Sequence, residues 1–199
     1  MVSELTSETA TARRKRVPKR EARERLIQST ITLLRVLPFD EVTNQTICAE
    51  ADLNPSTILQ HFGTLDKLLG ETALELVKRH LAKVLSADGY PTTFADPDVE
   101  LRNRLVAWLL LNGDDPEQYR SHLLEDEVFI EFQKLSLQVD QRAAKAWTTV
   151  TTMLIEAYSV FKSTHAMSDE ELSDVLYMIV AMRADLPSIE RTLGWAPGE

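Results

Sequence analysis

The sequence has few of the features that stabilise secreted and membrane proteins. Its 199 residues include a single cysteine, Cys48, so no disulfide can form within the chain. No apolar run approaches the roughly 20 residues that a membrane-spanning helix needs. The charges near the N-terminus are not followed by the apolar segment of a secretory leader. These absences predict a cytoplasmic protein in which Cys48 is a small, reduced, buried side chain.

Signatures of common enzyme sites are also missing. The four histidines, His61, His80, His122 and His165, lie far apart and lack the spacing of metal ligands. The sequence contains no glycine-rich phosphate loop and no nucleophile elbow. We therefore expect neither an enzyme nor a metal or cofactor site, although catalytic groups can converge from distant segments.

The chain is rich in helix-forming sequence. It has only 6 glycines, many Leu, Ala, Glu, Arg and Lys residues, and no alternating pattern typical of strands. These features predict an all-α fold. Apolar periodicity, with N-caps at Thr43, Asn54, Thr64 and Ser168, indicates helices at about 19–37, 43–51, 55–62, 64–84, 99–112, 116–135, 138–163 and 168–193.

Charge is distributed unevenly along the chain. The net charge is −9, but residues 1–80 hold 12 basic and 11 acidic residues (+1), and residues 81–199 hold 10 and 20 (−10). The segment from Arg13 to Arg25, "RRKRVPKREARER", has 8 basic and 2 acidic residues. This asymmetry suggests a basic binding end on an acidic body.

The segment "NPSTILQHF" carries the clearest functional signal. On a helix, Ile58 and Phe62 share one face and can pack inward. Four polar, non-acidic side chains are then expected on the opposite face: Ser56, Thr57, Gln60 and His61. Such a helix fits the major groove of DNA, and a preceding short helix across a tight turn makes a helix-turn-helix. The alternative is a pair of short amphipathic helices in an ordinary helical bundle.

Residues of about 20–69 resemble the DNA-binding domain of TetR-family transcriptional regulators. The similarity lies in "PFDEVTNQTICAEADLNPSTILQHFGTLDKLL", in which the following residues are in register: Phe39, Thr43, Ile47, Ala51, Leu53, Thr57, His61, Phe62 and Leu68. The chain departs from the family pattern at Asp52, where the family prefers Gly, and at Leu59 and Leu65, where it often has phosphate-contacting Tyr and Lys. Lys67 can substitute for the latter.

The resemblance implies three regions and a set of DNA contacts. Residues 1–18 would be a disordered basic arm, 19–85 a three-helix helix-turn-helix domain, and 86–199 a helical bundle for ligand binding and dimerisation. The expected DNA-binding residues are Arg13, Arg14, Lys15, Arg16, Lys19, Arg20, Thr43, Gln45, Asn54, Pro55, Ser56, Thr57, Gln60, His61 and Lys67.

The last two long segments carry wide apolar stripes, which predict two helices that pack on each other and, in this family, on a second subunit. The expected dimer residues are Tyr158, Phe161, Leu172, Val175, Leu176, Ile179, Val180 and Arg183. Alternatively, these stripes only complete the core of one chain. A dimer would present two reading helices to half-sites about one DNA turn apart.

The aromatic content of the C-terminal region suggests a cavity for an apolar or aromatic small molecule. Candidate lining residues are Trp108, Tyr119, Phe129, Phe132, Trp147 and Met153, with Arg104 and His122 as polar anchors. The sequence thus predicts a ligand-responsive regulator, by family default a repressor, that binds a palindromic operator as a homodimer. The alternative is a dimeric ligand- or protein-binding module that has lost specific DNA reading.

Overall fold

The computed structural model describes residues 17–86, 96–119, 127–165 and 167–195. No strand occurs in these ranges, so the all-α prediction is confirmed. The elements in chain order are α1 (Lys19–Leu34), η1 (Phe39–Glu41), α2 (Asn44–Glu50), α3 (Ser56–His61), α4 (Leu65–Ser86), α5 (Pro97–Leu111), η3 (Pro116–Tyr119), α6 (Glu127–Leu137), α7 (Gln141–His165), α8 (Asp169–Ala184) and α9 (Leu186–Thr192).

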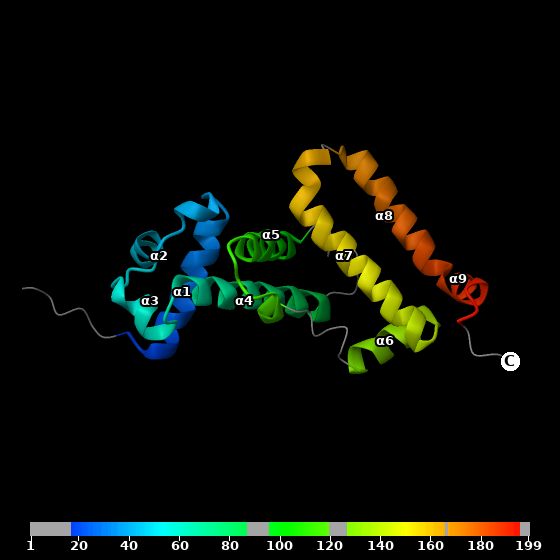
Figure 1. The fold of residues 1–199 in the computed structure, drawn as a ribbon, viewed down its shortest axis with the longest axis horizontal. Helices are drawn as coiled ribbons and strands as arrows, with labels where there is room; N and C mark the ends of the chain where they lie inside the picture. The colour runs from blue at the N-terminus through cyan, green and yellow to red at the C-terminus, as the bar shows by residue number, and fades with distance from the viewer. Residues whose placement is uncertain (1–16, 87–95, 120–126, 166, 196–199) are drawn as a thin grey trace, which may run out of the picture.

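The helices form two groups joined through α5. Helix α1 packs against α2, α3 and α4, and α4 makes its most extensive contacts with α5. Helix α5 in turn contacts α7, which packs against α6 (Figure 1). The group α1–α4, which we call the head, therefore lies at one end of the molecule, with α7 to α9 at the other.

Local capping signals explain several helix starts. The Thr43 side chain accepts a hydrogen bond from the Thr46 amide (3.3 Å), and the Thr46 hydroxyl accepts one from the Thr43 amide (2.8 Å). The same reciprocal arrangement joins Ser168 and Glu171 at the start of α8. Each pair satisfies two amides that would otherwise lack partners in the first helical turn, and both caps were predicted.

The main apolar core continues from the head into α5. It includes Leu26, Ile47, Leu68 and Leu76 from the head together with Leu105 from α5, all at most 1% exposed. A second, smaller cluster joins Leu137, Val139, Ala143, Ala144 and Leu186 at the junction of α6, α7 and α9. The structure therefore does not confirm a domain division at residues 85 and 86.

Two predicted helices are interrupted. The range 116–135 begins with the 3-10 turn η3, and an α-helix starts only at Glu127 in α6; residues 120–126 lie outside the described ranges. The range 168–193 is divided into α8 and α9 at Asp185, two residues before Pro187. Because proline lacks an amide hydrogen and clashes with the preceding turn, it cannot continue α8 and instead opens α9.

No helix in the described ranges is long and apolar enough to cross a membrane.

Candidate nucleic-acid interface

A tight turn that ends α2 sets the direction in which α3 leaves. The amide of Leu53 donates to the Cys48 carbonyl (2.9 Å), and the amide of Asp52 donates to the Ala49 carbonyl (3.2 Å). Asp52 has a φ of 52°, in the left-handed region. This is a Schellman C-cap with aspartate at the position that glycine usually occupies. Leu53 packs against the core and fixes the turn.

The left-handed backbone at Asp52 leads to a stability prediction. Asp52→Gly should be more stable than Asp52→Ala by about 1 kcal/mol, because only glycine adopts this φ without strain. Both variants lose the aspartate side chain, so the comparison isolates the backbone term. At Ala49, in the helical part of α2, the order should reverse, with Ala49→Gly destabilising. Urea unfolding of the three variants provides the test, and equal stability of the two Asp52 variants would contradict it.

Asn54 caps α3, as predicted, although the helix starts at Ser56 rather than Pro55. The Asn54 Oδ1 accepts hydrogen bonds from the Ser56 amide (3.0 Å) and hydroxyl (2.9 Å), and its carbonyl accepts from the Thr57 amide (2.8 Å). On the inner face, Ile58 and Phe62 are 1% and 6% exposed. The head therefore holds α3 by two apolar side chains, and its other face remains outside.

The outward face of α3 differs from the predicted one. Ser56 and Gln60 are exposed, but Thr57 and His61 are only partly so. Leu59, which was noted in the sequence only because it lacks the phosphate contact of the family's Tyr, is 70% exposed. The exposed face thus runs through Ser56, Leu59 and Gln60, which share a side of the helix by their i, i+3 and i+4 spacing.

His61 is only partly exposed, so the prediction that it stands outward with Ser56 and Gln60 is not confirmed. Its Nδ1 is buried without a hydrogen-bond partner in the described part of the chain. Burial lowers the pKa of His61, and the positive charges of Lys19 and Arg23 lower it further. His61 therefore favours its neutral form beside these two cations.

The basic residues of α1 divide into structural and available ones. Arg23 donates to the His61 carbonyl, pairs with Glu71 and lies over the Phe62 ring (4.3 Å to the centroid), so it joins α1, α3 and α4. Lys19 is exposed at the first position of α1. Arg20, predicted to contact DNA, pairs with Glu24 within α1 on the surface.

The other predicted DNA contacts are on the surface of the head. The exposed residues are Thr43, Gln45, Asn54, Pro55 and Lys67. Lys67 lies in the first turn of α4. The Thr64 hydroxyl caps this helix by accepting a hydrogen bond from the Lys67 amide (3.2 Å). The arm residues Arg13, Arg14, Lys15 and Arg16 lie outside the described ranges.

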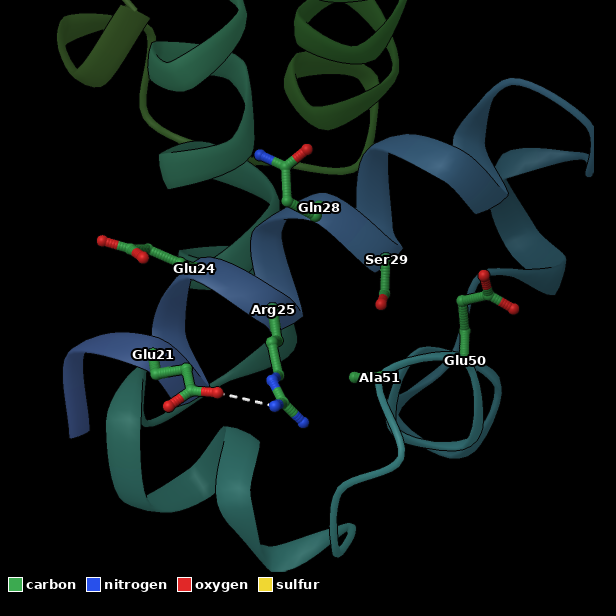
Figure 2. A pocket seen from close by; sticks show the side chains of 7 residues that line it. All are labelled: Glu21, Glu24, Arg25, Gln28, Ser29, Glu50 and Ala51. Carbon is green, nitrogen blue, oxygen red and sulfur yellow. Dashed lines mark hydrogen bonds and ion pairs between the residues drawn. The ribbon is translucent and has the colours of Figure 1, made fainter. Parts of the chain in front are cut away.

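A hollow of about 370 Å³ lies between α1 and α2 (Figure 2). Its walls carry the carboxylates of Glu21, Glu24 and Glu50 and one guanidinium, that of Arg25, which pairs with Glu21 (2.6 Å). The lining is therefore net acidic and unsuited to phosphate.

The predicted ligand-binding residues lie in different environments. Tyr119 is a core residue, 9% exposed, whose hydroxyl donates to Asp114 Oδ2 (2.6 Å); burial, with the Asp114 carboxylate, raises its pKa. Trp108 packs edge-on against Phe39 of the head, with ring centroids 6.2 Å apart. The guanidinium of Arg104 lies over that same Phe39 ring, 5.5 Å from its centroid.

The remaining lining candidates lie farther along the chain. Trp147 packs on the small cluster around Ala144, whereas Phe132 and Met153 are 57% and 64% exposed. Phe129 is half-buried, and His122 lies outside the described ranges. The described candidates thus do not surround one cavity. The prediction relied on residue type, which does not indicate that their tertiary partners are different. No group of three or more potential metal ligands occurs in the described ranges.

Helix α8 begins with acidic residues and continues with an unbroken apolar run at residues 175–182, yet none of its residues is buried. Its large exposed side chains are Val175, Tyr177, Met178, Val180 and Met182, and Leu172, Leu176 and Ile179 are only half-buried. The main contacts of α7 are with α5 and α6, and those of α8 are with α9, so the predicted packing of α7 on α8 is not the principal one. A helix apolar on most sides is normally covered.

The other predicted dimer residues are mixed. Phe161 on α7 is 55% exposed, and Tyr158 is half-buried. Arg183 is half-buried and donates from Nη2 to the Ser136 hydroxyl of α6 (3.0 Å).

An ionic network that the sequence did not reveal joins the head to α5. Asp96 and Asp98, which lie outside every predicted helix, are 5% and 3% exposed at the start of α5. Lys83 of α4 donates to both carboxylates (2.9 and 2.6 Å), and Arg35 at the end of α1 pairs with Asp98. His80 Nδ1 lies 2.9 Å from Asp96 and is the donor, since an ionised carboxylate only accepts.

The comparisons with known proteins add no family. A scan against protein-family models finds no match, and a search of curated proteins finds no similar sequence. The TetR resemblance therefore stays a prediction.

Proposed function

We propose that this chain is a DNA-binding transcriptional regulator that reads DNA with α3. The observation that carries the proposal is the α2–turn–α3 unit: a Schellman turn at Asp52, an inner face anchored by Ile58 and Phe62, and an exposed outer face without an acidic residue. Such a unit can place a helix in the major groove.

Dimerisation is the second part of the proposal. The unburied apolar surface of α8 supports an interface with a second copy of the chain, because an apolar helix of this kind is unfavourable in water. A twofold pair places two α3 helices on half-sites about one turn apart and thus implies a palindromic operator.

Regulation by a small molecule is the third part. Helix α5 connects α7 to the head: Arg102 pairs with Glu156 (3.1 Å), Asn103 donates to Ser159 (3.1 Å), and Asp98 pairs with Arg35. An apolar or aromatic ligand that binds one arrangement of α5 and α7 better than another would shift the spacing of the two heads. Release of DNA on ligand binding, hence repression, rests on the family resemblance, and action in the cytoplasm rests on the single, unpaired cysteine of the sequence.

The experiment that tests the proposal is selection of DNA from a random pool by the purified protein, followed by sequencing. We expect a palindromic site with half-sites about 10 base pairs apart. Failure to enrich any sequence at low salt would instead favour the second candidate, a dimeric binding module that has lost specific reading. That candidate is motivated by Leu59 and Leu65, which stand where the family often has phosphate-contacting residues.

The N-terminal arm provides a prediction about salt dependence. Replacing Arg13, Arg14, Lys15 and Arg16 with glutamine should weaken operator binding and make the slope of log K against log salt less negative by about 3.6 for each bound chain, or about 7 for a dimer, because each phosphate contact contributes roughly −0.9. Titrations at several salt concentrations measure both quantities. Substituting Lys145 and Lys162, exposed residues of α7, with glutamine is the control and should leave the slope unchanged. An unaltered slope in the arm variant would contradict a role for the arm.

A further inference from the structure

The exposed leucine of α3 stands apart from the rest of the helix surface. Leu59 is 70% exposed, whereas the two other large apolar side chains of this segment, Ile58 and Phe62, are almost fully buried. Its neighbours on the outer face, Ser56 and Gln60, are polar and exposed. Leu59 therefore contributes nothing to the packing of the head, and its apolar surface is available to a partner.

The chemistry of the major groove supplies an apolar target for such a side chain. Among the four bases, only thymine presents a methyl group there, at C5, and apolar side chains recognise it by contact. The adjacent Gln60 carries an amide that can donate to N7 of an adenine and accept from its N6 amino group, or bind another base edge less fully. An exposed Leu–Gln pair thus matches an A·T-containing stretch better than a G·C stretch.

We propose that Leu59 is a specificity-determining residue that packs on a thymine C5-methyl in each half-site, beside an adenine bound by Gln60. This inference rests on the proposed DNA-reading function of α3. The Leu59 side chain cannot donate a hydrogen bond to a phosphate. Its exposed apolar surface is instead suited to contact with a base. The consequence is an operator with A·T pairs where α3 enters the groove.

The test removes the methyl group from the DNA rather than from the protein. Each thymine of the selected site is replaced in turn by deoxyuridine, which pairs identically but lacks the C5-methyl. For the wild-type protein, one thymine per half-site should lower affinity about fourfold when replaced, as expected for the loss of one buried methyl contact. Leu59→Ala changes both copies of α3, so affinity for the thymine site should fall about sixteenfold, and deoxyuridine at that position should have no further effect.

Controls separate this contact from general effects on folding or binding. Leu111→Ala changes an 88% exposed leucine at the end of α5 and should keep the wild-type response to deoxyuridine. Circular dichroism and urea unfolding should show Leu59→Ala to be as stable as the wild type, since the side chain is exposed. Gln60→Ala should relax the preference for adenine in a repeated selection while it leaves the deoxyuridine response in place.

The possible outcomes distinguish this inference from the function on which it rests. The protein could bind a defined site in which no thymine is sensitive to deoxyuridine, or deoxyuridine could lower the affinity of the wild type and of Leu59→Ala by the same factor. Either result refutes the role of Leu59 and leaves DNA reading in place. If the protein selects no sequence at all, the proposed function fails, and the role of Leu59 fails with it.

Discussion

Placing aspartate at both Met178 and Val180 of α8 should separate the proposed dimer into monomers and lower affinity for the proposed palindromic operator on the order of a hundredfold. These side chains are 66% and 64% exposed within one chain, and α8 has no buried residue, so the substitutions do not disturb the core of the chain. At an apolar interface, each new carboxylate would be desolvated without a partner. The affinity falls because each head then binds its half-site independently.

Two measurements examine this prediction together. Sedimentation velocity reports the mass in solution, and titration of the selected DNA reports affinity; circular dichroism confirms that the helices remain. The matched control is Leu111→Asp, which places the same charge at an exposed apolar position of α5 and should leave both quantities unchanged. A double variant that stays dimeric, or a monomer that binds as tightly as the wild type, would show that α8 does not form the required interface.

Asp96→Ala should reduce the free energy of unfolding by about 2–4 kcal/mol. The substitution removes the N-cap of α5, worth roughly 0.5–2 kcal/mol, and charge-assisted hydrogen bonds from His80 and Lys83, each worth about 1.5–3 kcal/mol when the partner is left buried. Lys83 is half exposed and can turn to solvent, which limits the loss. Glu131→Ala, which breaks an exposed ion pair with Lys134, is the control and should cost well under 1 kcal/mol.

The same network should make stability depend on acid. Burial by itself would raise the pKa of Asp96, but hydrogen bonds from His80, Lys83 and the Asp98 amide outweigh it and lower that pKa below the ordinary value of 3.8. A lowered folded-state pKa means that the unfolded chain binds the proton more tightly. The stabilisation from Asp96 is therefore present above about pH 4 and is lost as pH falls through the lower, folded value.

At the alkaline end, Lys83 behaves in the opposite sense. Its hydrogen bond to Asp98 raises the pKa above the ordinary value of 10.5; burial opposes this rise, and the bond to Asp96 adds to it. Its stabilising contribution is complete below pH 10.5 and is lost as pH rises through the higher, folded value.

Urea unfolding from pH 3 to 6 should show a shallower acid dependence in Asp96→Ala than in the wild type, and parallel profiles would contradict the network's role.

Local signals in the sequence were sufficient for the helices of the head. Pro18, Thr43, Asn54 and Thr64 mark helix starts by backbone chemistry that acts within three or four residues, so their effect could be read directly. Pro187 carries a similar signal, and the uninterrupted helix predicted across it was wrong, since α8 ends at Ala184 and α9 begins at Leu186. Element boundaries set by local rules were thus accessible from the sequence.

Features that depend on contacts between distant segments were not accessible in the same way. Helical spacing places His61 beside the outward residues, but the neighbouring α1, with Lys19 and Arg23, determines that its ring is partly buried. The buried positions of Asp96 and Asp98 could not be predicted, because their partners lie on α1 and α4. Buried charge can be recognised only when the opposite charge is placed beside it.

The central claim is that two copies of α3 occupy successive major grooves of one operator, and a hydroxyl-radical footprint of the selected site tests it most directly. We expect two protected patches of the DNA backbone, related by twofold symmetry and centred about one helical turn apart. Both patches should disappear together in the Met178 and Val180 double variant at the same protein concentration. A single protected patch, or uniform protection without symmetry, would contradict the account.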